Sequence, residues 1–515
     1  MNRKVTYLML ALLIVQACEK SPDEQVLPDE SFSTEVSDKE GFSVKGMVFA
    51  DGRPAAGVVV SDGRNVTMTD FDGRYWLRTS NEDDIVWVSI PSGYEVGTEN
   101  GWEPQFWARL DSAKIASGQV QRHDFFLKSA EQDNFRLIAF SDTHVRGTVA
   151  PQGISEMDSV IFTTKFIPHL LSQARATDRK VYAVVLGDMV QDSYVTSMKT
   201  GLPEYKKCLR DVDFPVFHLP GNHDYDGVQY EVHVDEEARK AKKYYRDHLG
   251  PTYYSFNIGT NHFVMLDGTQ MTGGGFNKYI SRITARQYEW LKKDLERVED
   301  KNGTALVICC HQPFYMHNNG LNQGVGSIRK SNRDSVMALT TAFSKVTILS
   351  GHQHYSDIFS FTNGTSEVRQ YTHTAVAGPS YRSRLCSDGS PCGLTVYDFA
   401  GSGFTRRMSG YDPEVDFQVK TYSEENRFVL NIPAYEDGWS VMVLENGVRV
   451  KEAERVVRTD PDYEKEATEN KFSSGYGAVM SSHIFEYMPK DRDALVKMVI
   501  KDGKEENYTE EIKLQ

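Results

Sequence analysis

Short apolar runs in the middle of the chain each stop at a cluster of Gly, Asp, Asn or His. Residues 181–186, for instance, form a run of six apolar residues that is followed by Gly187 and Asp188. A run of this length, with helical spacing after it, predicts a buried parallel strand. Four further runs end in the same way, at residues 135–140, 215–220, 305–310 and 346–349. Ligands bind at the carboxyl ends of such strands, so the clusters predict a metal centre there.

Other stretches add helices and antiparallel strands to this pattern. Residues 157–174 and 284–298 carry apolar side chains at helical spacing, which predicts two helices. Residues 253–258 and 262–266 are joined by a short turn that contains Gly, which predicts an antiparallel pair. Further strands are expected at residues 357–361, 368–374 and 393–398. We therefore expect residues 131–408 to form an α/β (α+β) domain, a four-layer sandwich of two mixed β-sheets flanked by helices.

Residues 41–130 have the short strands and tight turns of a separate β-sandwich. Asp-Gly pairs at 62–63 and 72–73 are hairpin signals. The pattern of glycines, ending in Asp72-Gly73-x-Tyr75, resembles the carboxypeptidase regulatory-like β-sandwich, a module that usually serves as scaffolding. Its aromatic residues either line a sugar-binding face or pack in a core or interface, which is the favoured interpretation. They are Trp87, Tyr94, Trp102, Phe106 and Trp107.

The tail of the chain, residues 409–515, returns to a β pattern. Apolar strands with Asn-Gly and Asp-Gly turns predict a second small sandwich, with strands at residues 427–432, 440–444 and 494–500. Between them, residues 451–470 form a charged insert, which we interpret as a solvated loop. We find no catalytic constellation in this tail.

The first residues predict export. Arg3 and Lys4 precede an apolar stretch of eleven residues, 5–15, shorter than the about 20 that a membrane-spanning helix needs, so residues 1–17 are expected to be a signal peptide. Ala17 directly before Cys18 resembles the lipobox of bacterial lipoproteins, which implies lipidation of Cys18. The alternative is ordinary signal cleavage with Cys18 incidental. Residues 18–40 are polar and acidic, and we expect a disordered tether to a cell-envelope membrane.

Composition narrows the classes of partner. The 515 residues are 40% hydrophobic and 25% charged, which is typical of several soluble globular domains. The formal net charge of −14 argues against binding of a nucleic acid backbone, but it allows a small anionic substrate held by local positive charge. Membrane attachment would then depend on the lipid anchor alone.

Export also affects the cysteines, because the compartment outside the cytoplasm permits disulfides. Cys386 and Cys392 flank a loop of Ser, Asp, Gly and Pro residues. We expect these two residues to form a disulfide.

The clusters at the strand ends form an ordered set of motifs. They are Asp142-x-His144, Gly187-Asp188, Gly221-Asn222-His223-Asp224, His311 and Gly351-His352-x-His354. In this order they resemble the calcineurin-like metallophosphoesterase family. The whole layout, with β domains on both sides, is similar to exported calcineurin-like phosphoesterases of Bacteroidetes-type bacteria.

The resemblance implies hydrolysis of phosphate esters at a dinuclear metal centre. Two divalent or mixed-valence ions (Mn, Fe or Zn) would supply a bridging hydroxide as the nucleophile and charge to offset the phosphate oxygens. Asp188 would bridge the two ions. The other ligands implied by the family are Asp142, His144 and His354 for the first ion, and Asn222, His311 and His352 for the second.

Further roles follow from the same resemblance and from loop positions. His223 would face the substrate and protonate the leaving oxygen, and Asp224 would orient its imidazole. His317, Arg382 and Arg384 lie on loops, where they either contact the substrate or belong to the surface.

Two classes of function therefore remain. The favoured one is a metallophosphoesterase that acts on a small phosphorylated substrate, either a monoester or a diester. The alternative is a surface-displayed lipoprotein that binds glycan or a partner and has a vestigial phosphoesterase core. A vestigial core is expected to have lost ligands, and every family ligand position is filled in this sequence.

Overall fold

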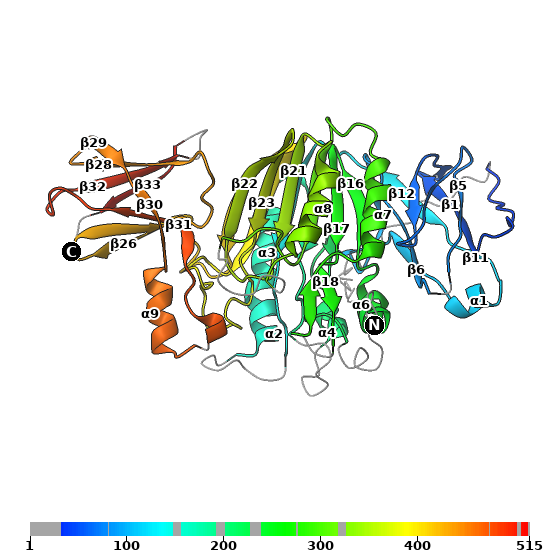
Figure 1. The fold of residues 1–515 in the computed structure, drawn as a ribbon, viewed down its shortest axis with the longest axis horizontal. Helices are drawn as coiled ribbons and strands as arrows, with labels where there is room; N and C mark the ends of the chain where they lie inside the picture. Colours follow the sequence, from blue (N-terminus) through cyan, green and yellow to red (C-terminus); the bar gives the residue numbers. More distant parts are fainter. Residues whose placement is uncertain are drawn as a thin grey trace, which may run out of the picture.

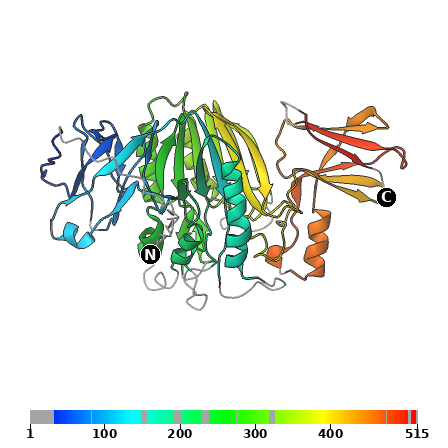
Figure 2. The same cartoon turned by 180° about the vertical axis from the view of Figure 1, so that it is seen from behind.

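Three β-rich bodies lie in a row, with the central body between an N-terminal and a C-terminal domain (Figures 1 and 2). The structure is a computed structural model. It describes residues 32–80, 82–147, 156–191, 201–226, 238–273, 277–317, 326–472, 474–501 and 506–512. The predicted signal peptide, Cys18 and most of the tether lie outside these ranges. Within them, no helix combines the length and apolar character needed to cross a membrane.

The central body contains two mixed sheets. The first has the strand order β15-β14-β13-β24-β25, in which β13, β14 and β15 are parallel and β24 and β25 run antiparallel. The bounds are β13 (Asn134–Phe140), β14 (Lys180–Val185), β15 (Val216–His218), β24 (Gly393–Ala400) and β25 (Gly403–Gly410). The apolar runs thus form the predicted strands, and each parallel strand ends at one of the polar clusters.

The second sheet has the order β16-β17-β20-β21-β23-β22. Its parallel strands are β17, β20, β21 and β23, and the predicted antiparallel pair is β16 and β17. The bounds are β16 (Tyr254–Ile258), β17 (Asn261–Leu266), β20 (Ala305–Cys310), β21 (Lys345–Ser350), β22 (Asp357–Asn363) and β23 (Ser366–Thr372). A small separate hairpin pairs β18 (Thr269–Met271) with β19 (Tyr279–Ser281).

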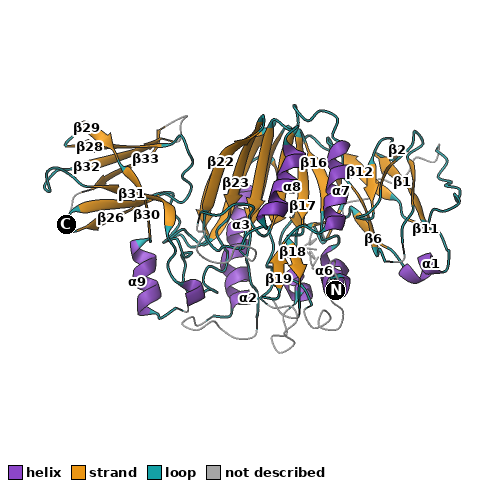
Figure 3. Cartoon of the chain, in the orientation of Figure 1, coloured by secondary structure: helices purple, strands orange, loops and turns teal. Residues whose placement is uncertain are grey.

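Helices cover the outer faces of the two sheets, which confirms the predicted four-layer sandwich (Figure 3). The first sheet packs against a continuous helix, α2 (Asp158–Ile161), η1 (Phe162–Phe166) and α3 (Ile167–Arg175), and against α4 (Leu202–Cys208) and α6 (Arg239–Leu249). The middle segment of this continuous helix, η1, is a π-helical turn. The second sheet packs against α7 (Ala285–Glu296) and α8 (Lys330–Thr340).

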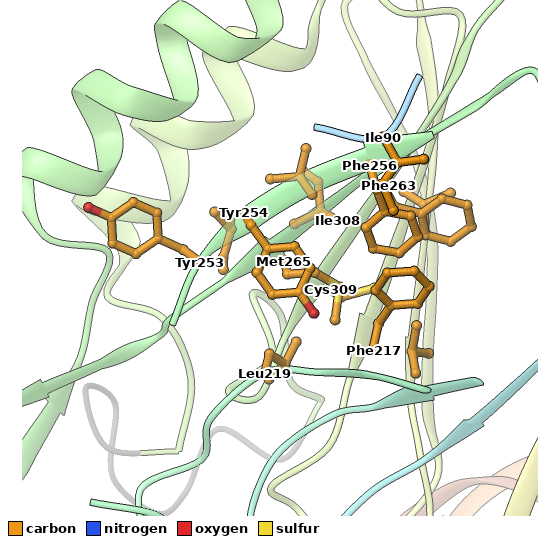
Figure 4. Close-up of a cluster of buried hydrophobic side chains, with 14 of the residues drawn as sticks. Ile90, Phe217, Leu219, Tyr253, Tyr254, Phe256, Phe263, Met265, Ile308 and Cys309 are labelled. Atoms are coloured by element: carbon orange, nitrogen blue, oxygen red, sulfur yellow. The ribbon is translucent and has the colours of Figure 1, made fainter. Parts of the chain in front are cut away.

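The core lies between the facing sheets and is rich in aromatic residues (Figure 4). Phe217 of the first sheet stacks on Phe256 of the second, with ring centroids 3.9 Å apart, and Phe263 stacks on Phe256 in turn at 5.0 Å. Burial of such rings removes a large apolar area from water and dominates the energetics of the core. The same packing fixes the distance between the two sheets, and hence between the strand ends that carry the polar clusters.

The N-terminal domain consists of two small sheets, as expected for a β-sandwich. One sheet contains β1 (Val44–Ala50), β2 (Arg53–Pro54), β5 (Arg74–Leu77), β7 (Tyr94–Val96), β11 (Gln121–Arg122) and β12 (Phe125–Ser129). The other contains β3 (Val59–Ser61), β4 (Val66–Met68), β6 (Ile85–Val88) and β10 (Trp107–Arg109). The remaining elements are β8 (Thr98–Glu99), β9 (Glu103–Pro104) and α1 (Ser112–Ala116).

This domain shares its core with the central body. Trp87 packs against Tyr253 and Trp290 of the central body, with ring centroids 6.1 and 6.2 Å apart. Trp102 and Phe106 are also buried, so these three aromatic residues serve packing, as the favoured interpretation held. The backbone of the domain also covers both sheet edges. The carbonyl of Trp102 accepts from the Val216 N–H of β15, and that of Ile90 accepts from the Asn257 N–H of β16.

The C-terminal domain is a second sandwich of two four-stranded sheets. One contains β26 (Lys420–Glu424), β27 (Arg427–Asn431), β30 (Glu454–Arg458) and β31 (Ser481–Tyr487). The other contains β28 (Ser440–Glu445), β29 (Val448–Glu452), β32 (Val496–Lys501) and β33 (Glu506–Ile512). The insert at 451–470 is not a solvated loop, because it forms β30 and the helix α9 (Pro461–Glu469), with η3 (Ser474–Tyr476) beyond it. Asp460 caps α9 by accepting from two backbone N–H groups, and Tyr463 is fully buried.

Two buried histidines predict a loss of stability in acid. Burial lowers the pKa of His218 to about 3 and that of His373 to about 4, whereas both titrate near 6.5 in an unfolded chain. The unfolded chain therefore binds more protons below pH 6.5, so the free energy of unfolding falls from pH 6.5 towards pH 4 and is unaffected above pH 6.5. At pH 5 each histidine is expected to cost about 2 kcal/mol.

Urea unfolding at pH 7 and pH 5, with EDTA present to remove metal effects, measures this loss. His218→Gln removes one titrating group, so the difference between the two pH values is expected to shrink by about 2 kcal/mol. An unchanged difference would contradict the role of His218.

Candidate metal centre

Seven polar side chains meet where the parallel strands of both sheets end. Asp142 and His144 follow β13, Asp188 follows β14, and Asn222 follows β15. From the second sheet, His311 follows β20, and His352 and His354 follow β21. The order of strands in the two sheets therefore brings together residues that are up to 212 positions apart in the chain, from 142 to 354.

The first group is formed by Asp142, His144 and His354. Nε2 of His354 lies 3.2 Å from Oδ1 of Asp142 and 3.0 Å from Nε2 of His144. Ligand atoms of the three residues lie within 4.8 Å of one another, close enough to share one metal ion. Oδ1 of Asp142 is buried and receives no hydrogen bond from any described residue, although Oδ2 accepts from Ser141 and from the His352 N–H.

The second group is formed by Asp188, His311 and His352. Nε2 of His311 lies 3.1 Å from Oδ2 of Asp188 and 3.1 Å from Nδ1 of His352. Asp188 also lies 3.7 Å from Nε2 of His144, so it reaches both groups. Six of the seven ligands that the family resemblance implied thus fall into these two groups, with Asp188 between them, and the seventh, Asn222, lines the same cavity.

The tautomers of two histidines fit a bound cation. Nδ1 of His311 lies 2.7 Å from the Leu186 carbonyl, and Nδ1 of His354 lies 2.7 Å from the Gly378 carbonyl. A carbonyl only accepts, so each Nδ1 carries the proton, and in the neutral ring each Nε2 presents a lone pair. These lone pairs converge with carboxylate oxygens, which is the mixed N and O ligand set that binds Zn, Fe and Mn.

Burial and neighbouring charges shift the pKa values of these groups in opposite directions. Burial raises the pKa of Asp188 and of Asp142, but the surrounding imidazoles outweigh it and hold both well below their usual range. Against its burial, the two carboxylates raise the pKa of His311 to about 9, so at neutral pH a metal ion has to displace the Nε2 proton of this ring when it binds. Burial, aided by His311, lowers the pKa of His352 to about 3. Both carboxylates are therefore negatively charged at neutral pH, as metal ligands must be.

The backbone at these strand ends is strained. Five of the seven residues have left-handed backbone torsions, namely Asp142 (φ 54°), His144 (φ 41°), Asp188 (φ 51°), His352 (φ 72°) and His354 (φ 57°). Such torsions cost about 1–3 kcal/mol each for residues with a side chain and cluster at functional sites. Asp and His adopt left-handed torsions more often than most residues, but most Asp and His residues do not, so residue type alone could not predict this conformation.

Two glycines allow the strand ends to approach one another. A Cβ at Gly187, whose φ is +92°, would lie 2.7 Å from both the Gly221 nitrogen and Nδ1 of His311. A Cβ at Gly351 would lie 1.8 Å from the Ser141 hydroxyl. The glycines that precede Asp188 and His352 are therefore required by the close contact between the two sheets.

The role predicted for Asp224 is wrong. Its carboxylate does not orient the His223 ring, because it accepts four backbone N–H groups, from Asp188, Met189, Val190 and Gly221, at 2.8–3.2 Å. It thereby ties the Asp188 turn to the loop that carries Asn222. Burial beside Asp188 raises the pKa of Asp224 to about 7.

His223 lies next to the first group, with its ring 4.8 Å from that of His144. Its Nδ1 contacts the carbonyl of Gln191, which orients the ring in place of Asp224. The backbone N–H of His223 donates to Oδ1 of Asp188 at 2.9 Å. A ligand atom of His223 also lies within 4.8 Å of those of His144 and Asp188.

The metal centre opens into a cavity of about 440 Å³. His144, Asp188, Asn222, His223, His352 and His354 line its inner part. The other wall is formed by residues outside the family motifs. Pro379 and Ser387 lie between β23 and β24, and Tyr463, Gly475 and Tyr476 belong to the C-terminal domain. Sequence reasoning missed this wall. The Asp460-Pro461 pair, a signal for a helix start, was the one indication of α9.

The three loop residues predicted as substrate contacts lie in different places. Nδ1 of His317 pairs with Asp357, and Arg384 pairs with Asp412 and Glu414, and neither residue lines the cavity. Arg384 therefore belongs to the protein surface, which is the second of the two positions considered for it. The guanidinium of Arg382 lies 5.7 Å from the ring centre of Tyr476, which places it behind the cavity wall.

The predicted disulfide is not formed in the structure. Cys386 and Cys392 are free cysteines whose sulfur atoms lie 3.7 Å apart, beyond the roughly 2.05 Å of an S–S bond. The loop between them does close as expected, because the Cys386 N–H donates to the Ser390 carbonyl. The two sulfur atoms thus meet in a buried non-bonded contact.

Comparison with known families agrees with this geometry. Three family models match in series: "N terminal of Calcineurin-like phosphoesterase" over residues 42–130, "Calcineurin-like phosphoesterase" over residues 135–356, and "C terminal of Calcineurin-like phosphoesterase" over residues 370–508. The chain belongs to the calcineurin-like phosphoesterases. Members of this family use a dinuclear metal centre. All three bodies of this calcineurin-like phosphoesterase thus have counterparts in the family.

Individual relatives of this phosphoesterase match over shorter stretches. Purple acid phosphatase 15 of Arabidopsis thaliana is 38% identical over 104 residues, 20% of this chain and 18% of the relative. Purple acid phosphatase 18 of the same plant is 27% identical over 227 residues, 42% of this chain and 48% of the relative. The chain therefore matches less than half the length of these curated relatives. Among solved structures, a dimetal phosphatase from Danio rerio matches with a TM-score of 0.35 and 13% identity, over 58% of this chain and 96% of that one.

Proposed function

We propose that this protein hydrolyses phosphate esters at two divalent metal ions held at the strand ends of its central body. The observation that carries the proposal is the pair of ligand groups that meet at Asp188 and open into one cavity. Asp142, His144 and His354 would hold one ion, Asn222, His311 and His352 the other, and Asp188 both. When bound, the two ions supply a nucleophilic hydroxide at neutral pH and positive charge for the phosphate oxygens.

The residues of this chain set up that chemistry. The carbonyls of Leu186 and Gly378 fix the rings of His311 and His354, so that their Nε2 lone pairs point at the centre. The packing of Asp224 against four backbone N–H groups holds Asp188 in its strained conformation. His223 lies in the same cavity. Because its Nδ1 faces the Gln191 carbonyl, proton transfer by this ring takes place at Nε2.

Metal analysis combined with turnover of p-nitrophenyl phosphate tests the proposal. We expect about two ions per chain and hydrolysis that is abolished by a chelator and restored by Mn, Zn or Fe. A panel of monoesters and diesters assayed with each metal then assigns the substrate class. A purified protein that holds no metal, or holds metal and hydrolyses no ester in the panel, would overturn the proposal.

We further propose that the protein works at the cell envelope as a lipoprotein, as residues 1–18 indicate. The net charge of −14 disfavours binding to anionic headgroups, so attachment would depend on acyl chains at Cys18. Cys18→Ser is expected to shift the protein from the membrane to the soluble exported fraction or to leave it unprocessed, with metal content and activity unchanged. Fractionation followed by immunoblotting measures the shift. Wild-type protein in the soluble fraction would contradict the anchor.

A further inference from the structure

The C-terminal domain supplies one wall of the cavity at the metal centre. Tyr463 of α9 and Gly475 and Tyr476 of η3 line the cavity together with His223 and the metal-ligand candidate His354. Figure 1 shows α9 beside the loops at the end of the central sheets, and the chain passes from the central body to the C-terminal domain after β25. No family motif includes these residues, and the proposed chemistry does not use them.

Tyr476 is held in place from several sides. Its hydroxyl lies 2.6 Å from the hydroxyl of Ser380, and its carbonyl accepts a hydrogen bond of 2.8 Å from the buried Tyr463. The guanidinium of Arg382 lies 5.7 Å from the centre of its ring, within the range of a cation–π contact. Ser380 itself has a left-handed backbone (φ 54°), so strain is tolerated at the residue that positions the ring.

The wall is also fixed to the central body. Ser383 donates to Glu466 of α9 at 2.8 Å, and the Val479 N–H donates to the Ser387 carbonyl at 2.9 Å. Asp388, which is fully buried, accepts from the Ser356 N–H and lies 3.0 Å from Nε2 of His483. These contacts join the C-terminal domain to the central body, so Tyr476 is held in the lining of the cavity without any closing motion.

We propose that Tyr476 binds the organic part of the phosphate ester and selects esters that carry a flat ring, such as an aryl group or a nucleobase, over short alkyl esters. This inference rests on the proposed function. The metal ligands line the inner part of the cavity, so a bound phosphate group points its organic substituent towards the opposite wall. The cavity, at about 440 Å³, is larger than a phosphate group requires and within the range of pockets that bury whole small molecules. An aromatic ring presents a face on which another ring stacks.

Two phosphonates that cannot be hydrolysed separate this contact from the chemistry. Phenylphosphonate and methylphosphonate carry the same anionic group, and they differ in the ring. Calorimetric titration of each into the full-length protein with added Mn²⁺ gives two dissociation constants. We expect wild-type protein to bind phenylphosphonate up to about tenfold more tightly than methylphosphonate, the size of one good aromatic contact.

Variants at Tyr476 then assign the preference. Tyr476→Ala and Tyr476→Leu are expected to remove it by weakening phenylphosphonate alone, whereas Tyr476→Phe, which keeps the ring, is expected to retain most of it. Arg384→Ala serves as a control, because Arg384 lies two residues from Arg382, pairs with Asp412 and Glu414, and does not line the cavity. Tyr476→Leu keeps apolar volume, so the test stands if Tyr476→Ala fails to fold.

The outcomes separate this inference from the function on which it rests. Equal loss of both phosphonates in the Tyr476 variants, or no preference in wild-type protein, would overturn the role of Tyr476 while ester hydrolysis remains. Failure to hydrolyse any ester would overturn the proposed function, and the titrations would still show whether the ring is recognised. If Tyr476 binds the ring of the ester, Tyr476→Leu is also expected to raise the KM for p-nitrophenyl phosphate while the metal content stays unchanged.

Discussion

Replacing Asp188 with asparagine is expected to lower both metal content and the rate of ester hydrolysis by more than about 10²-fold, beyond the 10–100-fold typical of groups that merely support a ligand. Asp188 is the carboxylate that reaches both ligand groups, at 3.1 Å from Nε2 of His311 and 3.7 Å from Nε2 of His144. An amide carries no charge and bridges two cations poorly. Plasma emission analysis of the purified variant, together with turnover of p-nitrophenyl phosphate, measures both losses.

Asp294→Asn is the matched control for this variant. Asp294 is also a buried carboxylate, but it pairs with Ser255 and His262 at the opposite ends of the strands. The control is expected to keep metal and activity, even if it loses stability. If Asp188→Asn retained two tightly bound ions and full activity, the bridging role would be wrong.

Replacing His223 with alanine is expected to keep both metal ions and to reduce the rate by about 10²–10⁴-fold, the range for loss of a general acid. His223 lies in the cavity beside His144, and its Nδ1 contacts a backbone carbonyl, so Nε2 is the site of proton exchange. The loss should be greatest for esters with poor leaving groups, because these need the proton most. Comparing an alkyl ester with p-nitrophenyl phosphate measures this difference.

Metal content decides between the two roles open to His223. One of its ligand atoms lies within 4.8 Å of those of His144 and Asp188, so a ligand role is the competing explanation. Loss of an ion from His223→Ala would establish that role and remove the general acid. His317→Ala, which changes a histidine paired with Asp357 outside the cavity, is expected to leave metal and rate unchanged.

The sequence predicts the central sheets and the assembly of the ligand groups because both depend on residue types. A run such as that of β20 is apolar at every position and is buried at every position. Its end, His311, then has to lie at the sheet edge. What could not be predicted depends on exact positions in space. The carboxylate of Asp224 could have turned towards His223 or towards the backbone, and only the structure shows that it accepts four backbone N–H groups.

The insert in the C-terminal domain is a second feature that residue types alone do not predict. Residues 451–470 are mostly charged, and charge alone predicts solvent exposure. Tyr463 is nevertheless fully buried, and its hydroxyl holds the backbone of Tyr476 against the cavity. Contacts between domains leave no periodic pattern in either segment, so a wall built from two domains is not visible in one sequence.

The N-terminal domain has a consequence for any attempt to divide the protein. The carbonyls of Trp102 and Ile90 accept from N–H groups of β15 and β16, the outermost strands at this side of the two central sheets. Removing residues 41–130 would leave both edges open, together with the apolar surface under Trp87. Open strand edges recruit other chains, and the catalytic segment expressed by itself would therefore tend to aggregate. The N-terminal sandwich thus shields the central body from association with other chains.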